Sequence, residues 1–132
     1  MHIRLLAGVT IVALAAAAPA RGHHSFAAEY DAAKPVSVSG TVTRIEWTNP
    51  HARFYVDVKE ASGVVSSFEF ELGSPNSLMR RGWSRNSLKP GDAVSIEGFL
   101  ARRDPHVANA RSVTLADGKK VFAGSSFDTQ AP

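Results

Sequence analysis

The sequence predicts an all-β fold, a small five-stranded Greek-key barrel of the OB-fold type with one short helix between strands three and four. Three observations predict it. Apolar and β-branched residues alternate with polar ones in five separate segments after residue 34. The order of elements is three strands, a short helix and two strands. A Lys-Pro-Gly-Asp turn precedes the fourth strand, which reads Val-x-Ile-x-Gly. An open β-sandwich or roll of similar length is the alternative.

The first predicted strand begins at Val36, and its valines share one parity as far as Val42. Ile45 and Trp47 fall on the opposite parity. This switch predicts a bulge or bend near Arg44, as in a strand that curls around a small barrel.

The second and third predicted strands form a hairpin. Residues 53–58 and 64–72 both alternate, and residues 60–63 form the loop between them. Residues 48–51 contain an Asn-Pro pair, which is typical of a turn, so they separate the first strand from the second.

A short helix is predicted to begin after the third strand. Ser74 is a suitable N-cap, and Pro75 occupies the first helical position, where proline is tolerated best. Leu78 and Met79 are expected to form its buried face.

The remaining strands follow a tight turn at residues 88–92. Residues 93–100 and 108–115 alternate and form strands four and five. A last short segment, residues 120–122, follows an Asp-Gly turn.

The first 20 residues are predicted to be a secretory signal peptide, which would send the protein to the periplasm or outside the cell. After Arg4, residues 5–18 are apolar or small except for one threonine. This run is shorter than the roughly 20 residues needed to span a bilayer as a helix. An amino-terminal membrane anchor is the alternative. The rest of the sequence contains no other long apolar stretch, so no transmembrane segment is expected after processing.

The cleavage site has two candidate positions. Ala18 and Ala20 form a small-x-small pattern, which predicts Arg21 as the first mature residue. A cut after Gly22 also fits and would make His23 the first residue.

The mature chain is predicted to consist of an arm (21–34), the barrel (35–123) and a flexible tail (124–132). The chain has no cysteine, so burial must stabilise the fold without disulfides. The formal net charge of +3 is too small to predict a nucleic-acid partner.

Two histidines follow the predicted cleavage site directly. With Arg21 first, the amino nitrogen, two backbone amides and the ring of His23 can surround Cu(II) or Ni(II) in a square plane. With His23 first, its amine and ring could chelate copper together, and a second histidine would complete the site. His24 and His51 are the further candidate ligands, because His51 lies in the loop between strands one and two. The pattern predicts a transition-metal site, with Cu(II) as the first candidate.

A Cu(I) site with sulfur ligands finds less support. The chain offers no thiolate, and Met79 is the only methionine after the leader, which argues against a Cu(I) thioether site. The simpler interpretation is that the two arm histidines are a polar start and His51 a turn residue. His106, in a loop with two arginines and an aspartate, is interpreted as a solvated residue.

A non-metal function is the alternative hypothesis. An interaction module could contact an envelope protein or glycan through the barrel face and the Arg-Gly-Trp segment that ends at Trp83. Arg53 would supply charge for such a surface, whereas Trp47 and Asn49 would shape the loop around His51. An enzyme is not expected, because the sequence contains neither a Gly-x-Ser-x-Gly nor a His-Glu-x-x-His pattern.

Several motifs resemble those of a bacterial family of exported proteins of unknown function, the domain of unknown function of the six-one-five-two type. They are residues 23–31, 40–42, 47–53, 74–76, 81–83, 88–92 and 108–111. The resemblance implies that the His-His-Ser start and the Asn-Pro-His turn belong to the family pattern, and it implies no activity. The architecture is also similar to small periplasmic OB-fold metallochaperones that bind Cu(I) through Met, His and Trp, from which this chain departs by lacking the Met ligands.

Overall fold

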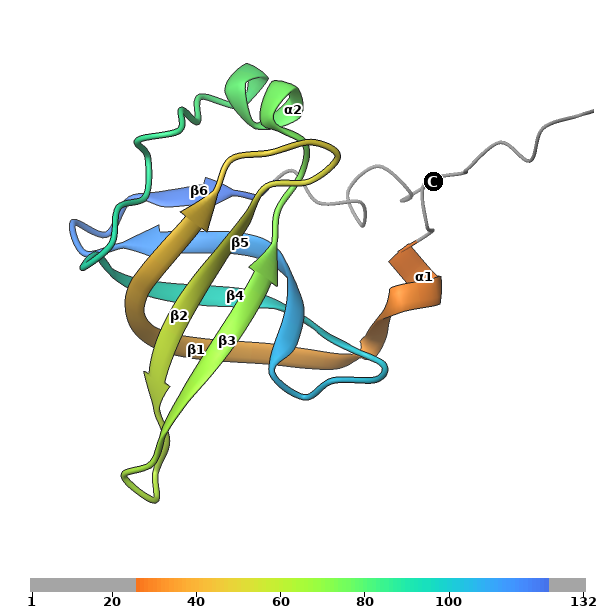
Figure 1. The fold of residues 1–132 in the computed structure, drawn as a ribbon, viewed down its shortest axis with the longest axis vertical. Coiled ribbons are helices and arrows are strands. Elements are labelled where there is room, and N and C mark those ends of the chain that lie inside the picture. The colour runs from red at the N-terminus through yellow and green to blue at the C-terminus, as the bar shows by residue number, and fades with distance from the viewer. Residues whose placement is uncertain (1–25, 124–132) are drawn as a thin grey trace, which may run out of the picture.

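The computed structural model describes residues 26–123, apart from the side chain of Phe122. Within this range the chain forms two short helices and six strands (Figure 1). Their bounds are α1 (Phe26–Glu29), β1 (Tyr30–Glu46), β2 (Arg53–Lys59), β3 (Val65–Glu71), α2 (Pro75–Arg80), β4 (Ala93–Ala101), β5 (Val107–Leu115) and β6 (Lys120–Phe122). Over these residues no helix is long and apolar enough to cross a membrane.

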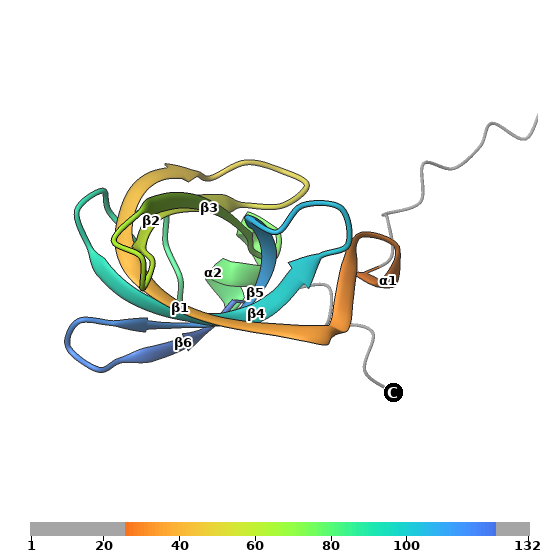
Figure 2. The ribbon, with the colours of Figure 1, turned by 90° about the horizontal axis from the view of Figure 1, so that it is seen from below.

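The strands close into a barrel. The sheet order is β3-β2-β1-β4-β5-β6, and β3 also pairs with β5. That last pairing is parallel and runs from Glu69 opposite Val107 to Glu71 opposite Asn109. In Figure 2 the first five strands form a ring, with β6 outside it and α2 visible through its opening. A three-strand meander followed by two strands that close the ring is the OB-fold order, so the predicted fold class is confirmed.

The first strand is longer than predicted. It begins at Tyr30, which pairs with Ala101 of β4, and regular pairing resumes only at Pro35. The described part of the predicted arm is therefore α1 and the start of β1. The predicted bend is confirmed, since the register with β2 shifts between Val42 and Arg44.

The hydrophobic core fills the ring. Phe54 and Phe70 are fully buried and stack with 5.3 Å between their ring centroids. Leu78 from α2, and Trp83 and Leu88 from the segment after it, belong to the same core. The helix α2 itself is seen through the opening of the ring (Figure 2). Burial of these large apolar groups is the main stabilising contribution in a chain without disulfides.

The helix α2 begins as predicted but buries only one of its two expected residues. The Ser74 side chain accepts a hydrogen bond from the Ser77 backbone amide over 3.2 Å, and Pro75 opens the helix. Leu78 is fully buried, but Met79 is 51% exposed, so its predicted burial was wrong. Consecutive helical residues point about 100° apart, so Met79 faces solvent when Leu78 points into the core.

Candidate functional site

His51 lies in the loop between β1 and β2, next to the end of β3. The two segments are joined by backbone hydrogen bonds from Ala52 to Gly73 over 3.0 Å and from Leu72 to Ala52 over 2.8 Å. The Nδ1 of His51 lies 3.2 Å from the Leu72 carbonyl oxygen. A carbonyl can only accept, so Nδ1 carries the hydrogen, and in the neutral ring the lone pair is on Nε2.

Glu71 is the carboxylate around which the neighbouring polar groups gather. It is 4% exposed, at the end of β3. The Tyr30 hydroxyl donates to its Oε2 over 3.0 Å, and a terminal guanidinium nitrogen of Arg53 lies 3.6 Å from the same oxygen. Its Oε1 is 3.9 Å from Nδ1 of His51. One buried carboxylate thus connects the start of β1, the His51 loop and β2.

Arg53 compensates two negative charges at once. Its Nε lies 3.0 Å from Oε1 of Glu69, without the alignment of a hydrogen bond, and its Nη2 lies 3.6 Å from Oε2 of Glu71. The register of β2 and β3 explains this, because Arg53 is directly opposite Glu71. The predicted binding residue Arg53 is therefore engaged within the protein, as part of a polar cluster.

The surroundings of Tyr30 keep its hydroxyl protonated. Burial raises the pKa of Tyr30 well above its usual range, and the negative charge of Glu71 and the hydrogen bond to it act in the same direction. The hydroxyl therefore remains a donor to Glu71 across the physiological pH range.

The segment that leads into this cluster is held from two sides. The Phe26 ring is buried and lies 5.6 Å from the Tyr30 ring and 5.8 Å from the Phe99 ring, between centroids. From the loop after β4, the Nε of Arg102 donates to the Ala27 carbonyl over 2.8 Å. The start of the described chain is thus packed against the barrel beside Glu71.

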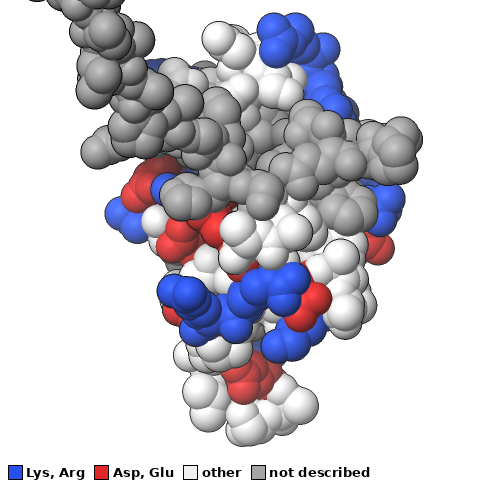
Figure 3. Space-filling view, turned by 90° about the vertical axis from the view of Figure 1, so that its right-hand side faces the viewer, with Lys and Arg blue, Asp and Glu red and all other residues white. Residues whose placement is uncertain are grey.

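A cavity of about 530 Å³ opens beside this cluster. The polar residues that line it are Glu29, Tyr30, Arg53, Glu69, Glu71, Arg103 and Asp104. Figure 3 views the side on which α1 lies, and charges of both signs are interspersed on this face. The volume of the cavity lies within the range of small-ligand sites. Its walls include residues of α1 and of strands β1, β2 and β3.

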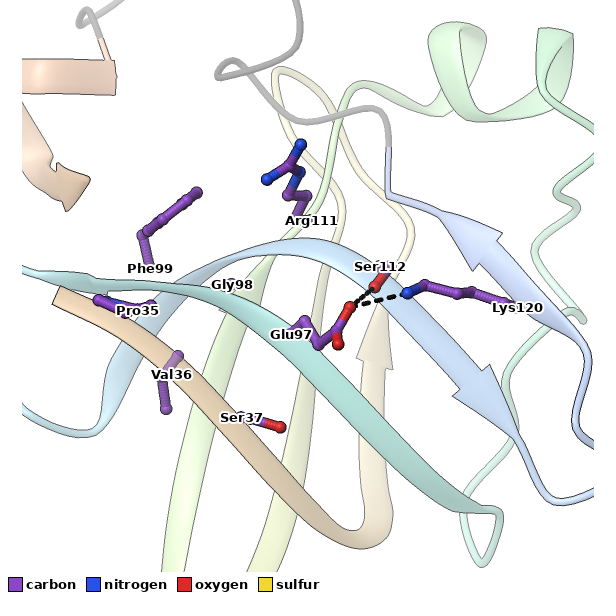
Figure 4. A pocket seen from close by; sticks show the side chains of 9 residues that line it. All are labelled: Pro35, Val36, Ser37, Glu97, Gly98, Phe99, Arg111, Ser112 and Lys120. Atoms are coloured by element: carbon purple, nitrogen blue, oxygen red, sulfur yellow. Dashed lines mark hydrogen bonds and ion pairs between the residues drawn. The ribbon is translucent and has the colours of Figure 1, made fainter. Parts of the chain in front are cut away.

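A second cavity, of about 590 Å³, lies over β1, β4 and β5 (Figure 4). Here Glu97 accepts hydrogen bonds from Lys120 and from the Ser112 hydroxyl, each over 2.8 Å. Lys120 in the first place, and then Ser112, lower the pKa of Glu97. We place the candidate site at the first cavity instead, because Glu71 and Arg53 in its wall belong to the polar cluster beside His51.

The structure separates the other predicted site residues. Trp47 is half-buried and packs against the core, whereas Asn49 is exposed in the His51 loop. Trp83 is 4% exposed and belongs to the core, which removes its ring from any contact surface. His106 is exposed in the loop before β5, and its ring meets the edge of Phe68 at 5.0 Å between centroids.

The two arm histidines, His23 and His24, lie outside the described residues. Between residues 26 and 123, no three His, Asp or Glu side chains are grouped so that they could hold a metal ion. A metal site that uses His51 therefore needs ligands from beyond this range.

Sequence reasoning missed Tyr30 and Glu71 as parts of the site. Glu71 lies between Phe70 and Leu72 on the outward-facing parity, where a solvated side chain is the ordinary expectation. Its burial depends on Tyr30, 41 positions earlier, and no local pattern signals that contact.

Comparisons with known proteins add a family and a fold likeness. The model of a family of unknown function, DUF6152, matches residues 10–109. No curated protein matches the sequence. Among solved structures, the mitochondrial single-stranded DNA binding protein Rim1 from S. cerevisiae is similar, with a TM-score of 0.49 and 9% identity. That match covers 63% of this chain and 93% of the other.

Proposed function

Because the chain belongs to the family of unknown function DUF6152, whose description assigns no activity, we propose its function from its own residues. The protein is an exported, non-enzymatic binding module that holds a transition-metal ion, Cu(II) first, between the loop histidine His51 and the arm histidines His23 and His24. Trp47 and Asn49 shape the loop that carries His51.

The orientation of the His51 ring is the observation that carries the proposal. Metal-binding histidines almost always donate their second ring nitrogen to a carbonyl or carboxylate, which fixes the tautomer and the ring direction. Nδ1 of His51 has the Leu72 carbonyl at 3.2 Å and the Glu71 carboxylate at 3.9 Å. Nε2 is then the nitrogen that would coordinate a metal.

The reach of the arm supports the same proposal. His23 is three positions before Phe26, a distance of at most about 11 Å along an extended chain. Phe26 is buried against Tyr30, whose hydroxyl binds the carboxylate beside His51. The described part of the arm therefore lies on the side of the barrel where His51 lies.

The donor atoms favour Cu(II). Imidazole nitrogens, an amino group and backbone amides form the tetragonal nitrogen sites that Cu(II) prefers. Sulfur donors would be needed for a typical Cu(I) site, and the chain contains no cysteine.

The test is a Cu(II) titration of protein that has been exported and processed through its own leader. The intact mass first establishes the amino-terminal residue. A visible d–d band that saturates at one copper per chain is expected, with a shifted or weakened band in His51→Ala and in the His23→Ala/His24→Ala double variant. The matched control is His106→Ala, which removes an exposed histidine from another loop. A band that fails to saturate, or that is identical in all variants, would overturn the proposal.

The alternative interaction module has weaker support. Its central residue, Trp83, is buried, so a partner would have to bind next to Arg81 and Gly82, which are exposed. A partner that co-purifies with the exported protein after chelator treatment, and is retained by the His51→Ala variant, would favour this alternative.

A further inference from the structure

The β2–β3 hairpin has a strand edge that the barrel leaves open. β3 pairs with β2 along its whole length, but its pairing with β5 begins only at Glu69. Among the strands that the structure describes, none pairs with the other edge of residues 65–68. In Figure 1 this end of the hairpin extends beyond the ring of the barrel. An open edge presents unpaired backbone groups with which another strand can pair.

The hydrogen-bond pattern identifies the backbone groups that are open. In an antiparallel pair, consecutive residues alternate between bonding to the partner strand and pointing away from it. The Glu69 amide donates to the His106 carbonyl over 2.9 Å, on the side of β5. The odd-numbered residues of β3 therefore point away from β2. By this alternation, the amides and carbonyls of Val65 and Ser67 point to the open edge.

This edge lacks the usual protection against pairing. Natural edge strands are commonly protected by charged side chains, proline or a bulge. Residues 61–68 contain no charged residue and no proline, and the pairing of β3 with β2 is regular. Val64 and Val65 are each 59% exposed, and only Met79 is a comparably exposed large apolar residue between residues 26 and 123. Such an edge is typical of a strand that pairs with another chain.

We propose that two copies of the protein associate through this edge, as an antiparallel pair of β3 strands. Val65 of one copy lies opposite Ser67 of the other, and the same pair recurs on the far side of a two-fold axis. Each pair forms two backbone hydrogen bonds, so four bonds join the copies and every open group is used. The sheets of the two barrels become continuous.

Only this register uses both open residues of each copy. If Val65 faced Val65, then Ser67 would face Gly63, which lies in the hairpin turn with a φ of 87°. If Ser67 faced Ser67, then Val65 would face Glu69, whose amide is already bonded on the β5 side. The open edge is therefore complementary to itself.

Charge and shape favour a second copy as the occupant. In a two-fold pair, a charge near the axis meets the same charge, and like charges opposite one another destabilise a sheet. The uncharged run of residues 61–68 avoids this repulsion. The lower end of the molecule in Figure 3, where the hairpin tip lies, is mostly uncharged. The turn residues Ala61, Ser62 and Gly63 are small, and they come to the point at which β5 begins on the other copy.

The short ladder implies a weak dimer. Four backbone hydrogen bonds and two pairs of valines bury less than a standard interface of about 1,600 Å². Sedimentation equilibrium of the exported and processed protein tests the proposal, with a chelator present so that no metal joins the copies. A monomer–dimer equilibrium with a dissociation constant below about 1 mM is expected.

Two variants change the open edge without changing the bonds to β2. Val65→Lys places a charge on each side of the axis, and Ser67→Pro removes an open amide at an edge position, where proline is tolerated. Each is expected to raise the dissociation constant at least about tenfold. Met79→Lys is the matched control, because it adds the same charge at the exposed side chain of α2, and an unchanged constant is expected. Circular dichroism establishes that the variants are folded.

Amide hydrogen exchange gives a second measurement, which needs no variant. The amides of Val65 and Ser67 should exchange slowly in concentrated protein and rapidly in dilute protein. The amides of Ser66 and Phe68 point to β2 and should be protected at both concentrations. Exchange at Val65 and Ser67 that is independent of concentration would overturn the proposal. So would a protein that stays monomeric at about 1 mM, a dimer that survives both edge variants, or a monomer that pairs this edge with a different protein.

Discussion

Tyr30 donates a hydrogen bond to Glu71 over 3.0 Å, although the two residues are 41 positions apart in the chain. The bond connects the first residue of β1 to the last residue of β3, and both side chains are buried. It closes the polar cluster that contains Arg53 and lies next to His51. The contact is therefore a structural element of the barrel as well as part of the candidate site.

Removing the Tyr30 hydroxyl is expected to destabilise the fold. Tyr30→Phe keeps the buried ring but leaves Glu71 without this donor, and a lost hydrogen bond to a charged group costs about 1.5–3 kcal/mol. Urea denaturation measures the change in the free energy of unfolding. Tyr55→Phe, with a half-buried ring stacked under Arg44, is expected to change it by less than about 0.5 kcal/mol. Equal losses in the two variants would contradict this explanation.

Alkaline pH is expected to destabilise the protein through Tyr30. Its pKa is raised in the folded state, chiefly by burial and then by Glu71, whereas the unfolded chain releases this proton near pH 10. The folded state therefore binds more protons above pH 10, so stability that is fully present below that pH is lost as the pH rises. The limiting slope is about 1.4 kcal/mol per pH unit.

The comparison with Tyr30→Phe isolates this effect, because lysines also titrate in the same range. The free energy of unfolding should fall more steeply above pH 10 in the wild type than in the variant. Near-ultraviolet absorbance of the two tyrosines should show Tyr30 ionising only as the protein unfolds. Identical slopes in the two proteins would exclude Tyr30 as the source.

The barrel could be predicted from the sequence because its signals are local. The alternation along each strand, the parity switch at Arg44 and the cap at Ser74 each involve residues within a few positions of one another. The order of such elements then restricts the topology to few possibilities.

The candidate site could be predicted only in part, because most of it consists of distant contacts. His51 was identified from its place after a proline turn, but its hydrogen bond to Leu72 depends on the pairing of β2 and β3. Glu71 has the outward parity of a solvated residue and is buried only because β1 begins earlier than its regular alternation. Tyr30 offered no periodic signal, since it lies where the register is irregular.

The two neighbouring residues of α2 are expected to differ sharply in their contribution to stability. Leu78→Ala removes a fully buried side chain from the end of the barrel and should cost about 2–5 kcal/mol, through lost burial and the cavity left behind. Met79→Ala serves as the matched control in the same helix. Because Met79 is largely exposed, its effect should stay within about 0.5 kcal/mol. Thermal and urea denaturation of both variants measure the two losses. A larger loss in Met79→Ala than in Leu78→Ala would contradict this orientation of α2.

Asn109 is a buried polar residue whose removal is expected not to harm the fold. It is fully buried in β5, opposite Glu71 and Phe99, and among residues 26–123 neither its Nδ2 nor its Oδ1 has a hydrogen-bond partner. An unsatisfied buried polar group costs about 1–3 kcal/mol, whereas an apolar group of similar shape carries no such penalty. Asn109→Leu is therefore expected to leave the free energy of unfolding unchanged or to raise it by about 1–2 kcal/mol.

The size-reducing variant Asn109→Ala provides the matched comparison, because it removes the same amide but leaves a void. It should be less stable than Asn109→Leu by about 1–3 kcal/mol, since the surrounding side chains cannot fully close the space. Urea denaturation of the two variants gives both differences directly. A loss of more than about 1 kcal/mol in Asn109→Leu would contradict the expectation that the buried amide is unsatisfied and costly.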